Sequence, residues 1–507
     1  MTTSSETLAL VKTARATPDD LIKSFVQPGS ATTGLQAYNL EAPSKKLFPI
    51  LTPFRNMLPR DAGGFAIQAN WKAITDINVA NVRAGVGEGL RGGIITHSQS
   101  EYLAAFRGFG LENNVTFEAG YAAKGYEDVK SLAVTTTLQA LMVQEERNIL
   151  GGNTSVALGT TPTPTTATAT TGGTIAAATY NVVCVALGLQ AYLDMVGANN
   201  GGIGVTFSNT TALVPGQITR TNAGGGTSTF GGGSARPSAA ASQVTTGATS
   251  TISATVATVT GAFGFAWFVG TTGNERLQSV TTINSVLLTS LNTTTSQLLS
   301  AIPGGIVTDF STSTLDFDGL LTQAVKSGNN GTILTMPNGV AGTGSGLTAD
   351  NAGGVTEFEQ MFATMYGKYR LSPSHIFVNP QELINLSKKV IQGSGAPLLQ
   401  MITGVGEKTV IMAGSKVGSY LNKVTGDEVP IIVHPNMPAG TILFYTQTVP
   451  YPLNGVPQVC RMLLRQDYYQ LEWPLVQRRY DYGVYFDGVL QHYAPFSMGV
   501  ITNIGNA

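Results

Sequence analysis

Apolar residues recur along this chain at two spacings, one typical of helices and the other of strands. Val134, Leu138, Leu141 and Ile149 fall on one face at helical spacing, and two glycines follow directly after Leu150. This pattern predicts one long helix over about 126–150.

Two shorter helices are expected after residue 300. Thr356 and Glu359 have the spacing of a capping box at the start of an apolar stripe. Asn379 is a favourable N-cap and Pro380 suits the first helical position, directly after the strand-like run "SHIFV".

Strand-like patterns predict a long hairpin before the long helix. The runs "FAIQANWKAITDINVA" and "VTFEA", between Phe65 and about Ala119, are read as its strands. The glycine-rich stretch "RAGVGEGLRGG" between them carries Arg83, Glu88 and Arg91, and it predicts a flexible, charged tip.

The segment from about 153 to 300 has a different pattern. Short β-type runs alternate with turns rich in Gly, Thr and Ser, and "GAFGFAWFVG" places Phe263, Phe265 and Trp267 on one strand face. Mixed helix and strand patterns occur on both sides of it. We therefore expect an all-β sandwich inserted into an α+β fold, and deletion of about 155–298 should leave that fold intact.

Composition narrows the classes of function. The chain has 507 residues, of which 12% are charged, against about 25% in ordinary soluble domains. A net charge of −1 gives no basic surface for nucleic acid, and Cys184 and Cys460 cannot build a disulfide framework. Neither a secretion signal nor an apolar run of membrane-spanning length is evident. The low charge favours burial against protein partners, because interface cores are poor in charged residues.

No catalytic or metal-binding pattern stands out. Gly85, Gly87 and Gly89 resemble a phosphate loop, but no Lys–Ser/Thr pair or helix follows, so we interpret them as a hairpin tip. The four histidines lack the local pairing of zinc sites and are interpreted as structural. Asp316 and Asp318 could bind a cation, but a turn before a helix explains them more simply. We expect no enzyme, no cofactor and no metal.

Arginines and aromatic residues are mixed near the C-terminus, over about 459–490. Their charges are balanced, with Arg465, Arg478 and Arg479 against Asp467, Glu472, Asp481 and Asp487. This balance favours a subunit contact with ion pairs across it over a surface for nucleic acid.

The order of these parts resembles the major capsid proteins of tailed bacteriophages, which have the Hong Kong 97-type fold. The similar segments are "NMLPRDAGG", "QEERNILGGN", "STLDFDGLLTQAV", "PSHIFVNPQELINLSKKV" and "RRYDYGVYFDGVLQHYAPFSMGVITNI". The segment 153–300 resembles the immunoglobulin-like or fibronectin-like domains that are inserted in some of these proteins.

The resemblance implies a division of the chain into domains. Residues near 62–122 would form the E-loop, which reaches over a neighbouring subunit, with inter-subunit contacts at its tip from Arg83, Glu88 and Arg91. The helix at 126–150 would be the spine helix. The implied divisions are 1–45, an N-terminal arm; 46–152, the E-loop and spine helix of the peripheral domain; 153–300, the inserted sandwich; 301–374, the peripheral domain continued; 375–450, the axial domain; and 451–507, the returning peripheral strands and C-terminus.

The resemblance also implies a structural function. Copies would assemble through pentamers and hexamers into an icosahedral shell around double-stranded DNA, with the inserted domain on the outer surface. The implied partners are copies of the chain itself, a separate scaffolding protein, a portal, decoration proteins and, non-specifically, packaged DNA, but no membrane. The location would be the virion, after assembly in the host bacterial cytoplasm.

Three alternatives remain. An encapsulin-like compartment shell is the nearest, although such chains are usually shorter. An adhesin-like surface protein would need a secretion signal and tandem β domains. An enzyme with a lectin-like insert would need a catalytic constellation.

Overall fold

The computed structural model describes residues 44–79, 83–198, 206–208, 213–393, 401–402, 410–411 and 417–505. The arm expected over 1–45 therefore lies almost entirely outside the described residues.

The chain divides into two compact units, Met1–Pro49 with Val115–Leu132, and Ile50–Asn114 with Ala133–Ala507. The described part of the first unit contains helix α4 (Phe117–Ala122) and the start of α5 (Val129–Gly151). There the hydroxyl of Ser44 donates to the carboxylate of Glu127 over 2.7 Å. The long helix predicted over 126–150 is confirmed as α5.

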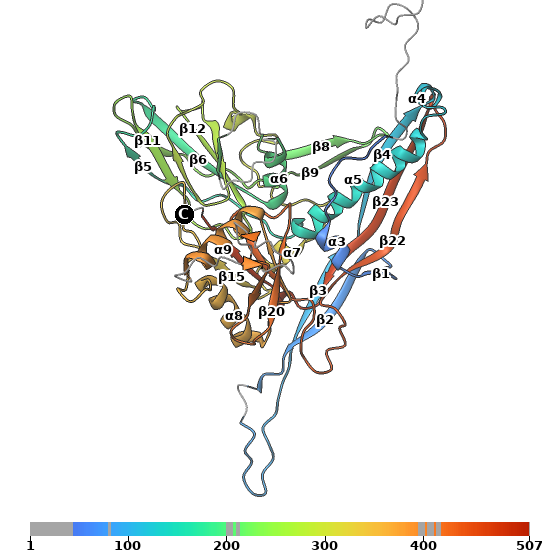
Figure 1. The fold of residues 1–507 in the computed structure, drawn as a ribbon, viewed down its shortest axis with the longest axis vertical. Coiled ribbons are helices and arrows are strands. Elements are labelled where there is room, and N and C mark those ends of the chain that lie inside the picture. Colours follow the sequence, from blue (N-terminus) through green and yellow to red (C-terminus); the bar gives the residue numbers. More distant parts are fainter. Residues whose placement is uncertain are drawn as a thin grey trace, which may run out of the picture. The chain divides into compact units, whose positions relative to one another are not determined.

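A four-stranded sheet lies in the second unit (Figure 1), with the order β1-β22-β23-β4. Its strands are β1 (Arg60–Ala62), β22 (Cys460–Glu472), β23 (Arg479–His492) and β4 (Arg107–Thr116). The period-two spacing of "YDYGVYF" places Tyr480, Tyr482, Val484 and Phe486 on one face of β23; the last three are buried, but Tyr480 is 39% exposed. The C-terminal part of α5 and the short helix α3 (Pro53–Met57) share one core with this sheet.

A six-stranded mixed sheet forms a second core, with the order β15-β24-β21-β16-β20-β19. Its strands are β15 (Thr332–Thr335), β24 (Gly499–Thr502), β21 (Ile442–Tyr445), β16 (His375–Val378), β20 (Glu428–Val433) and β19 (Ser419–Leu421). The accompanying helices are α7 (Leu320–Val325), α8 (Thr356–Tyr369) and α9 (Pro380–Gly393).

Both helices predicted in this region are present, but only one is capped as expected. The side chain of Asn379 accepts a hydrogen bond from the amide of Gln381 over 2.9 Å at the start of α9. In α8 the capping residue is Val355, so Thr356 is already helical and the expected capping box does not form.

The segment expected to be an all-β sandwich does contain two sheets, ordered β10-β6-β12-β13-β7 and β14-β11-β5. Their strands are β5 (Thr165–Ala169), β6 (Thr179–Leu187), β7 (Thr206–Ser208), β10 (Ala241–Val244), β11 (Thr251–Thr255), β12 (Gly264–Gly270), β13 (Arg276–Thr281) and β14 (Ser285–Leu288). The segment also contains a separate hairpin of β8 (Gln217–Thr221) with β9 (Thr227–Gly231), and the helix α6 (Leu189–Ala198). The expectation of an all-β segment is therefore wrong: "LQAYLDMV" forms a helix with a buried apolar face.

The larger of these two sheets packs on both sides. Val182, Cys184 and Ala186 of β6 face a core shared with the three-stranded sheet. The alternate residues Val183 and Val185 belong to the core that also holds α5 and the four-stranded sheet. The segment therefore shares a core with the rest of the second unit.

Candidate interaction surface

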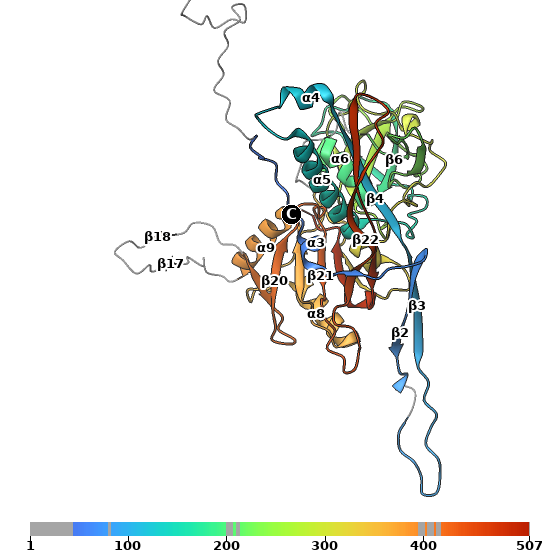
Figure 2. The same ribbon diagram turned by 90° about the vertical axis from the view of Figure 1, so that its right-hand side faces the viewer.

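A hairpin is present where the sequence predicts one, but its second strand lies earlier in the chain than predicted. β2 (Gln68–Asp76) pairs antiparallel with β3 (Ser98–Ala105), and Figures 1 and 2 show both strands running out beyond the sheets of the second unit. The expected second strand "VTFEA" is wrong: Val115 and Thr116 end β4, which pairs with β23 and not with β2, and α4 begins at Phe117.

Cross-strand contacts hold the two strands together near the base of the hairpin. Trp71 lies opposite Tyr102, and their rings stack with centroids 5.8 Å apart. The ring of Trp71 also meets Tyr493 edge-on at 6.2 Å. An isolated two-stranded hairpin is marginally stable in water, so these aromatic contacts stabilise an element that has no core of its own.

Large apolar side chains are exposed along the whole hairpin. The two most exposed are Ile94, at 90%, and Phe65, at 81%. Among the residues of the hairpin that the structure describes, the large exposed apolar side chains are Phe65, Ile67, Ile74, Ile77, Val79, Val86, Leu90, Ile94, Ile95 and Leu103. Exposed apolar side chains in such number mark an element that another molecule covers.

The tip carries the three charged residues singled out in the sequence. Arg83, Glu88 and Arg91 are exposed, and none forms an ion pair with any other described residue. The amide of Leu90 donates to the carbonyl of Gly87 over 3.0 Å in a turn, and no helix begins there. The reading of these glycines as a hairpin tip is confirmed.

Two hydrogen bonds to backbone carbonyls hold the base of the hairpin. The amide of Gly64 donates to the carbonyl of Leu464 over 2.9 Å, and Arg465 donates to the carbonyl of Ala66 over 2.9 Å. A Cβ on Gly64 would lie 2.8 Å from the ring of Phe106, so only glycine fits between this ring and β22. The exit of the hairpin is thereby fixed against β22.

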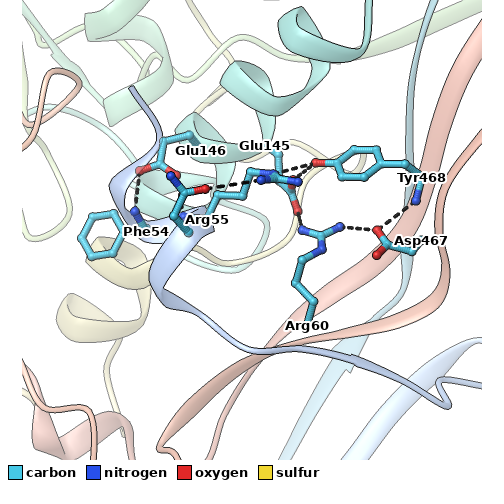
Figure 3. A network of polar contacts seen from close by, with 8 residues as sticks. Phe54, Arg55, Arg60, Glu145, Glu146, Asp467 and Tyr468 are labelled. Carbon is cyan, nitrogen blue, oxygen red and sulfur yellow. Dashed lines mark hydrogen bonds and ion pairs between the residues drawn. The ribbon is translucent and has the colours of Figure 1, made fainter. Parts of the chain in front are cut away.

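A buried charge network holds the segment that leads into the hairpin (Figure 3). Glu145 of α5 accepts from Arg60 over 2.5 Å, pairs with Arg55 over 3.3 Å and accepts from the hydroxyl of Tyr468. Arg60 also pairs with Asp467 over 2.7 Å. This network joins α3 and β1 to α5 and β22.

The neighbouring carboxylate, Glu146, binds three donors. It accepts from the backbone amides of Phe54 and Arg55, each over 2.8 Å, and from Nε2 of His434 over 2.6 Å. Nδ1 of His434 accepts from the amide of Asn436, which fixes the ring with its proton on Nε2. Both side chains are fully buried.

Burial and pairing shift the pKa values of three members of this network. Burial opposes the charge of Arg60, but the bond to Asp467 and the charge of Glu145 outweigh it and raise the pKa of Arg60. Burial likewise opposes ionisation of Asp467, but the bond from Arg60 lowers its pKa. Burial and the charge of Glu145 raise the pKa of Tyr468. The shifts of Arg60 and Asp467 both favour the charged forms, so this ion pair persists at neutral pH.

Sequence reasoning missed this anchor. Its signal was "QEERN", in which two adjacent acids, Glu145 and Glu146, lie in the part of α5 that enters the core. A buried acid implies a buried cation or donor.

The other charged residues singled out in the sequence have structural partners. Arg465 pairs with Asp487 over 2.5 Å and Arg479 with Asp481 over 2.8 Å. Both pairs form within the chain, and a subunit contact at these strands stays a prediction.

Asp316 and Asp318 also have partners within the fold. Asp318 accepts from the amides of Thr154 and Ser155 over 2.9 and 3.1 Å and pairs with Lys326 over 3.2 Å. Burial raises the pKa of Asp316 to about 6. Within the described ranges, no group of His, Cys, Asp and Glu side chains is placed to hold a metal ion. No described helix is both long and apolar enough to cross a membrane.

No protein-family model matches the sequence, and no curated protein matches it. Among solved structures, the chain is similar to the capsid of cyanophage P-SCSP1u, at 8% identity over 94% of each chain and a TM-score of 0.39. It is also similar to the capsid of an empty GTA particle, at 8% identity over 95% of this chain and 100% of the other, with a TM-score of 0.41. An encapsulin of Synechococcus elongatus matches over 37% of this chain and 57% of its own, at 16% identity and a TM-score of 0.23. TM-scores at this level establish neither a family nor a function, which have to be argued from the surfaces described above.

Proposed function

We propose that this chain is a self-assembling shell subunit, the major capsid protein of a tailed bacteriophage. The observation that carries the proposal is the hairpin, which exposes ten large apolar side chains on an element without its own core. Such a surface needs a partner, and in a closed symmetric shell every copy supplies one.

The anchor at the base of the hairpin supports this function. A projecting element can bind a neighbour with defined geometry only if its exit from the fold is rigid. The bonds of Gly64 and Arg465 and the network around Glu145 provide that rigidity. A charge of −1 on 507 residues also limits repulsion between many copies.

The finer features of the proposal follow the resemblance described above. Copies assemble through pentamers and hexamers around double-stranded DNA, the tip residues Arg83, Glu88 and Arg91 contact a neighbouring subunit, and the 153–300 segment faces outward. A scaffolding protein, a portal and decoration proteins are the further partners, and the chain acts in the virion without enzymatic activity.

Electron microscopy of the purified full-length chain tests the proposal. Closed shells of uniform size are expected from the native chain. A variant in which residues 78–96 are replaced by an Asn-Gly turn should keep its circular dichroism and melting temperature but form no shells. Shells from that variant, or a native chain that stays monomeric with or without a scaffold, would contradict the proposal.

The content of the particle separates the virus capsid from an encapsulin-like shell. Particles isolated from their natural source should hold nuclease-protected double-stranded DNA. Particles that hold a protein cargo and no DNA would favour the compartment shell.

A further inference from the structure

The six-stranded sheet has an open edge at β15. This strand pairs with β24 alone, and the amides of Thr332 and Met336 donate to carbonyls of the β24 segment over 3.0 and 2.9 Å. Backbone groups alternate in direction along a strand, so the N–H and C=O groups of Ile333 and Thr335 point away from the sheet. Within the described part of the chain they form no hydrogen bond.

A cavity of 180 Å³ lies along this edge, between β15 and α8. Gln360, Thr364 and Lys368, which are spaced four residues apart on one side of α8, line it. From β15 it is lined by Ile333 and by Thr332, whose hydroxyl is buried in a residue 7% exposed and has no hydrogen-bond partner among the described residues. The groove thus offers an extended chain two backbone donors, two acceptors and a hydroxyl.

We propose that this groove binds the hairpin tip of a second copy, with residues 93–97 added as a strand on β15. The inference rests on the proposed function for the presence of a second copy. The segment "GIITH" is rich in β-branched residues, yet it forms no strand in its own hairpin, and Ile94 and Ile95 are 90% and 55% exposed. The row of Gln360, Thr364 and Lys368 on α8 is about 12 Å long, which is the length of about four residues in an extended strand.

The charge beside the groove, on Lys368, lies at one end of β15. The hydroxyl of Tyr369 donates to the carbonyl of Asn330 over 2.9 Å, so the C-terminal end of α8 lies beside the start of β15. Lys368 is therefore near the start of β15 and has no ion pair in the described structure. Glu88 is the only acid in residues 83–97 and precedes the added strand. A strand parallel to β15 brings Glu88 toward Lys368, but it also brings Arg91, which is nearer to the added strand and has the same charge as Lys368. An exchange of the charges at positions 88 and 368 therefore decides whether the strand runs in this direction.

A peptide tests strand addition without altering the protein. The probe is a fluorescein-labelled peptide of residues 86–98, titrated into the full-length chain and followed by anisotropy. Methylation of the backbone nitrogen of either Ile94 or Ile95 should weaken binding about tenfold, and methylation of the other should change it by less than about twofold. Equal effects at both positions, or no saturable binding, would overturn the proposal.

Protein variants test the edge and the direction. Ile333→Pro removes one outward N–H and keeps the bonds to β24, so it should weaken binding of the native peptide about tenfold, while Ile333→Val should not. A peptide with Glu88→Lys should bind the native chain more weakly and regain affinity for the Lys368→Glu variant. Native-like binding to Ile333→Pro, or no recovery in the charge exchange, would contradict the assignment.

The two proposals can fail separately. If the native chain forms shells but Ile333→Pro binds the peptide and assembles as the native chain does, the groove assignment is wrong and the shell function stands. If no shells form under any condition but the peptide binds with the expected dependence on Ile333, the shell function is wrong.

Discussion

Glu146 is a fully buried carboxylate, and it is tolerated because three donors reach it. Two are backbone amides at the start of α3, and the third is Nε2 of His434. Burying a charge without partners is costly, whereas a set of short bonds from fixed donors offsets that cost. The same carboxylate therefore fixes α3 and the loop after β20 to α5.

Replacing the carboxylate of Glu146 should show how much its three hydrogen bonds contribute to stability. In Glu146→Gln one acceptor oxygen becomes an amide donor, so at least one of the three donors loses its partner. The free energy of unfolding should fall by about 1–3 kcal/mol, measured by urea denaturation. Glu101→Gln, at an exposed position on β3, is the matched control and should change it by less than about 0.5 kcal/mol. Equal stability of the two variants would show that the three hydrogen bonds to Glu146 contribute little to the stability of the fold.

Two other buried groups make stability depend on pH in opposite directions. Burial lowers the pKa of His492 from 6.5 to about 3, and neither ring nitrogen has a hydrogen-bond partner in the described part of the chain. Burial raises the pKa of Glu382 from 4.5 to about 7, against the bonds from Gly440 and Asn385. The contribution of His492 to the free energy of unfolding is complete above pH 6.5 and is lost as the pH falls toward 3. That of Glu382 is complete below pH 4.5 and is lost as the pH rises to 7.

Between pH 4.5 and 6.5 these two dependences largely cancel in the native chain, and single variants should reveal them. Relative to the native chain, His492→Leu should gain roughly 1.4 kcal/mol per pH unit as the pH falls below 6.5. Glu382→Gln, which keeps an acceptor for Gly440, should gain a similar amount per unit as the pH rises from 4.5 to 7. Denaturant melts across this range measure both slopes. Curves parallel to the native one would refute the assignment.

At the scale of elements, local patterns predicted α5, α8, α9 and the first strand of the hairpin, but not the partner strand β3 or the contacts between elements. The spacing of Val134, Leu138 and Leu141 was enough for α5 because helical periodicity is a local property. The helix α6 was missed because its apolar face belongs to a core built from distant segments. The strand ends were missed because pairing stops where the partner strand stops, which the sequence of one strand does not encode.

The end of α5 depends on a glycine. A Cβ on Gly152 would lie 2.4 Å from the carbonyl oxygen of Phe317 and 3.0 Å from that of Asn148, and backbone atoms cannot move aside as a side chain can. Gly152→Ala should therefore lower the free energy of unfolding by about 3 kcal/mol. Gly367 in α8 has open space at its Cβ position, so Gly367→Ala should raise it by up to about 1 kcal/mol. Thermal melts of the two variants should shift in opposite directions, and a shared direction would contradict the packing.

At the scale of the whole molecule, the described structure changes the expectation for the 153–300 segment. The amide of Asn284 donates to the side chain of Asn503 over 2.9 Å, and Arg147 pairs with Asp194 over 2.6 Å. Together with the shared core behind β6, these contacts tie the segment to both neighbouring sheets. The boundaries of the segment were inferred from composition, which carries no information about which face of a strand meets which core.

We now expect deletion of 155–298 to unfold the chain, contrary to the prediction from sequence. The deletion strips Val183, Val185 and Phe268 from a core that also contains Phe54 and Phe486. The deleted chain should lose its near-ultraviolet circular dichroism and bind a hydrophobic dye. Replacing only the turn at 222–226 between β8 and β9 by Asn-Gly is the control and should melt as the native chain does. A cooperative melt of the deleted chain would restore the original prediction.

The double-sided packing of β6 also bears on how this protein can evolve. Odd-numbered positions such as Val183 and Val185 pack in one core, and even-numbered positions such as Val182 and Cys184 pack in another. Substitutions in α5 or β23 should therefore be accompanied by changes at the odd positions alone, and substitutions in β11 or β14 by changes at the even ones. One strand would then record two separate histories, read from alternate residues of the same nine-residue segment.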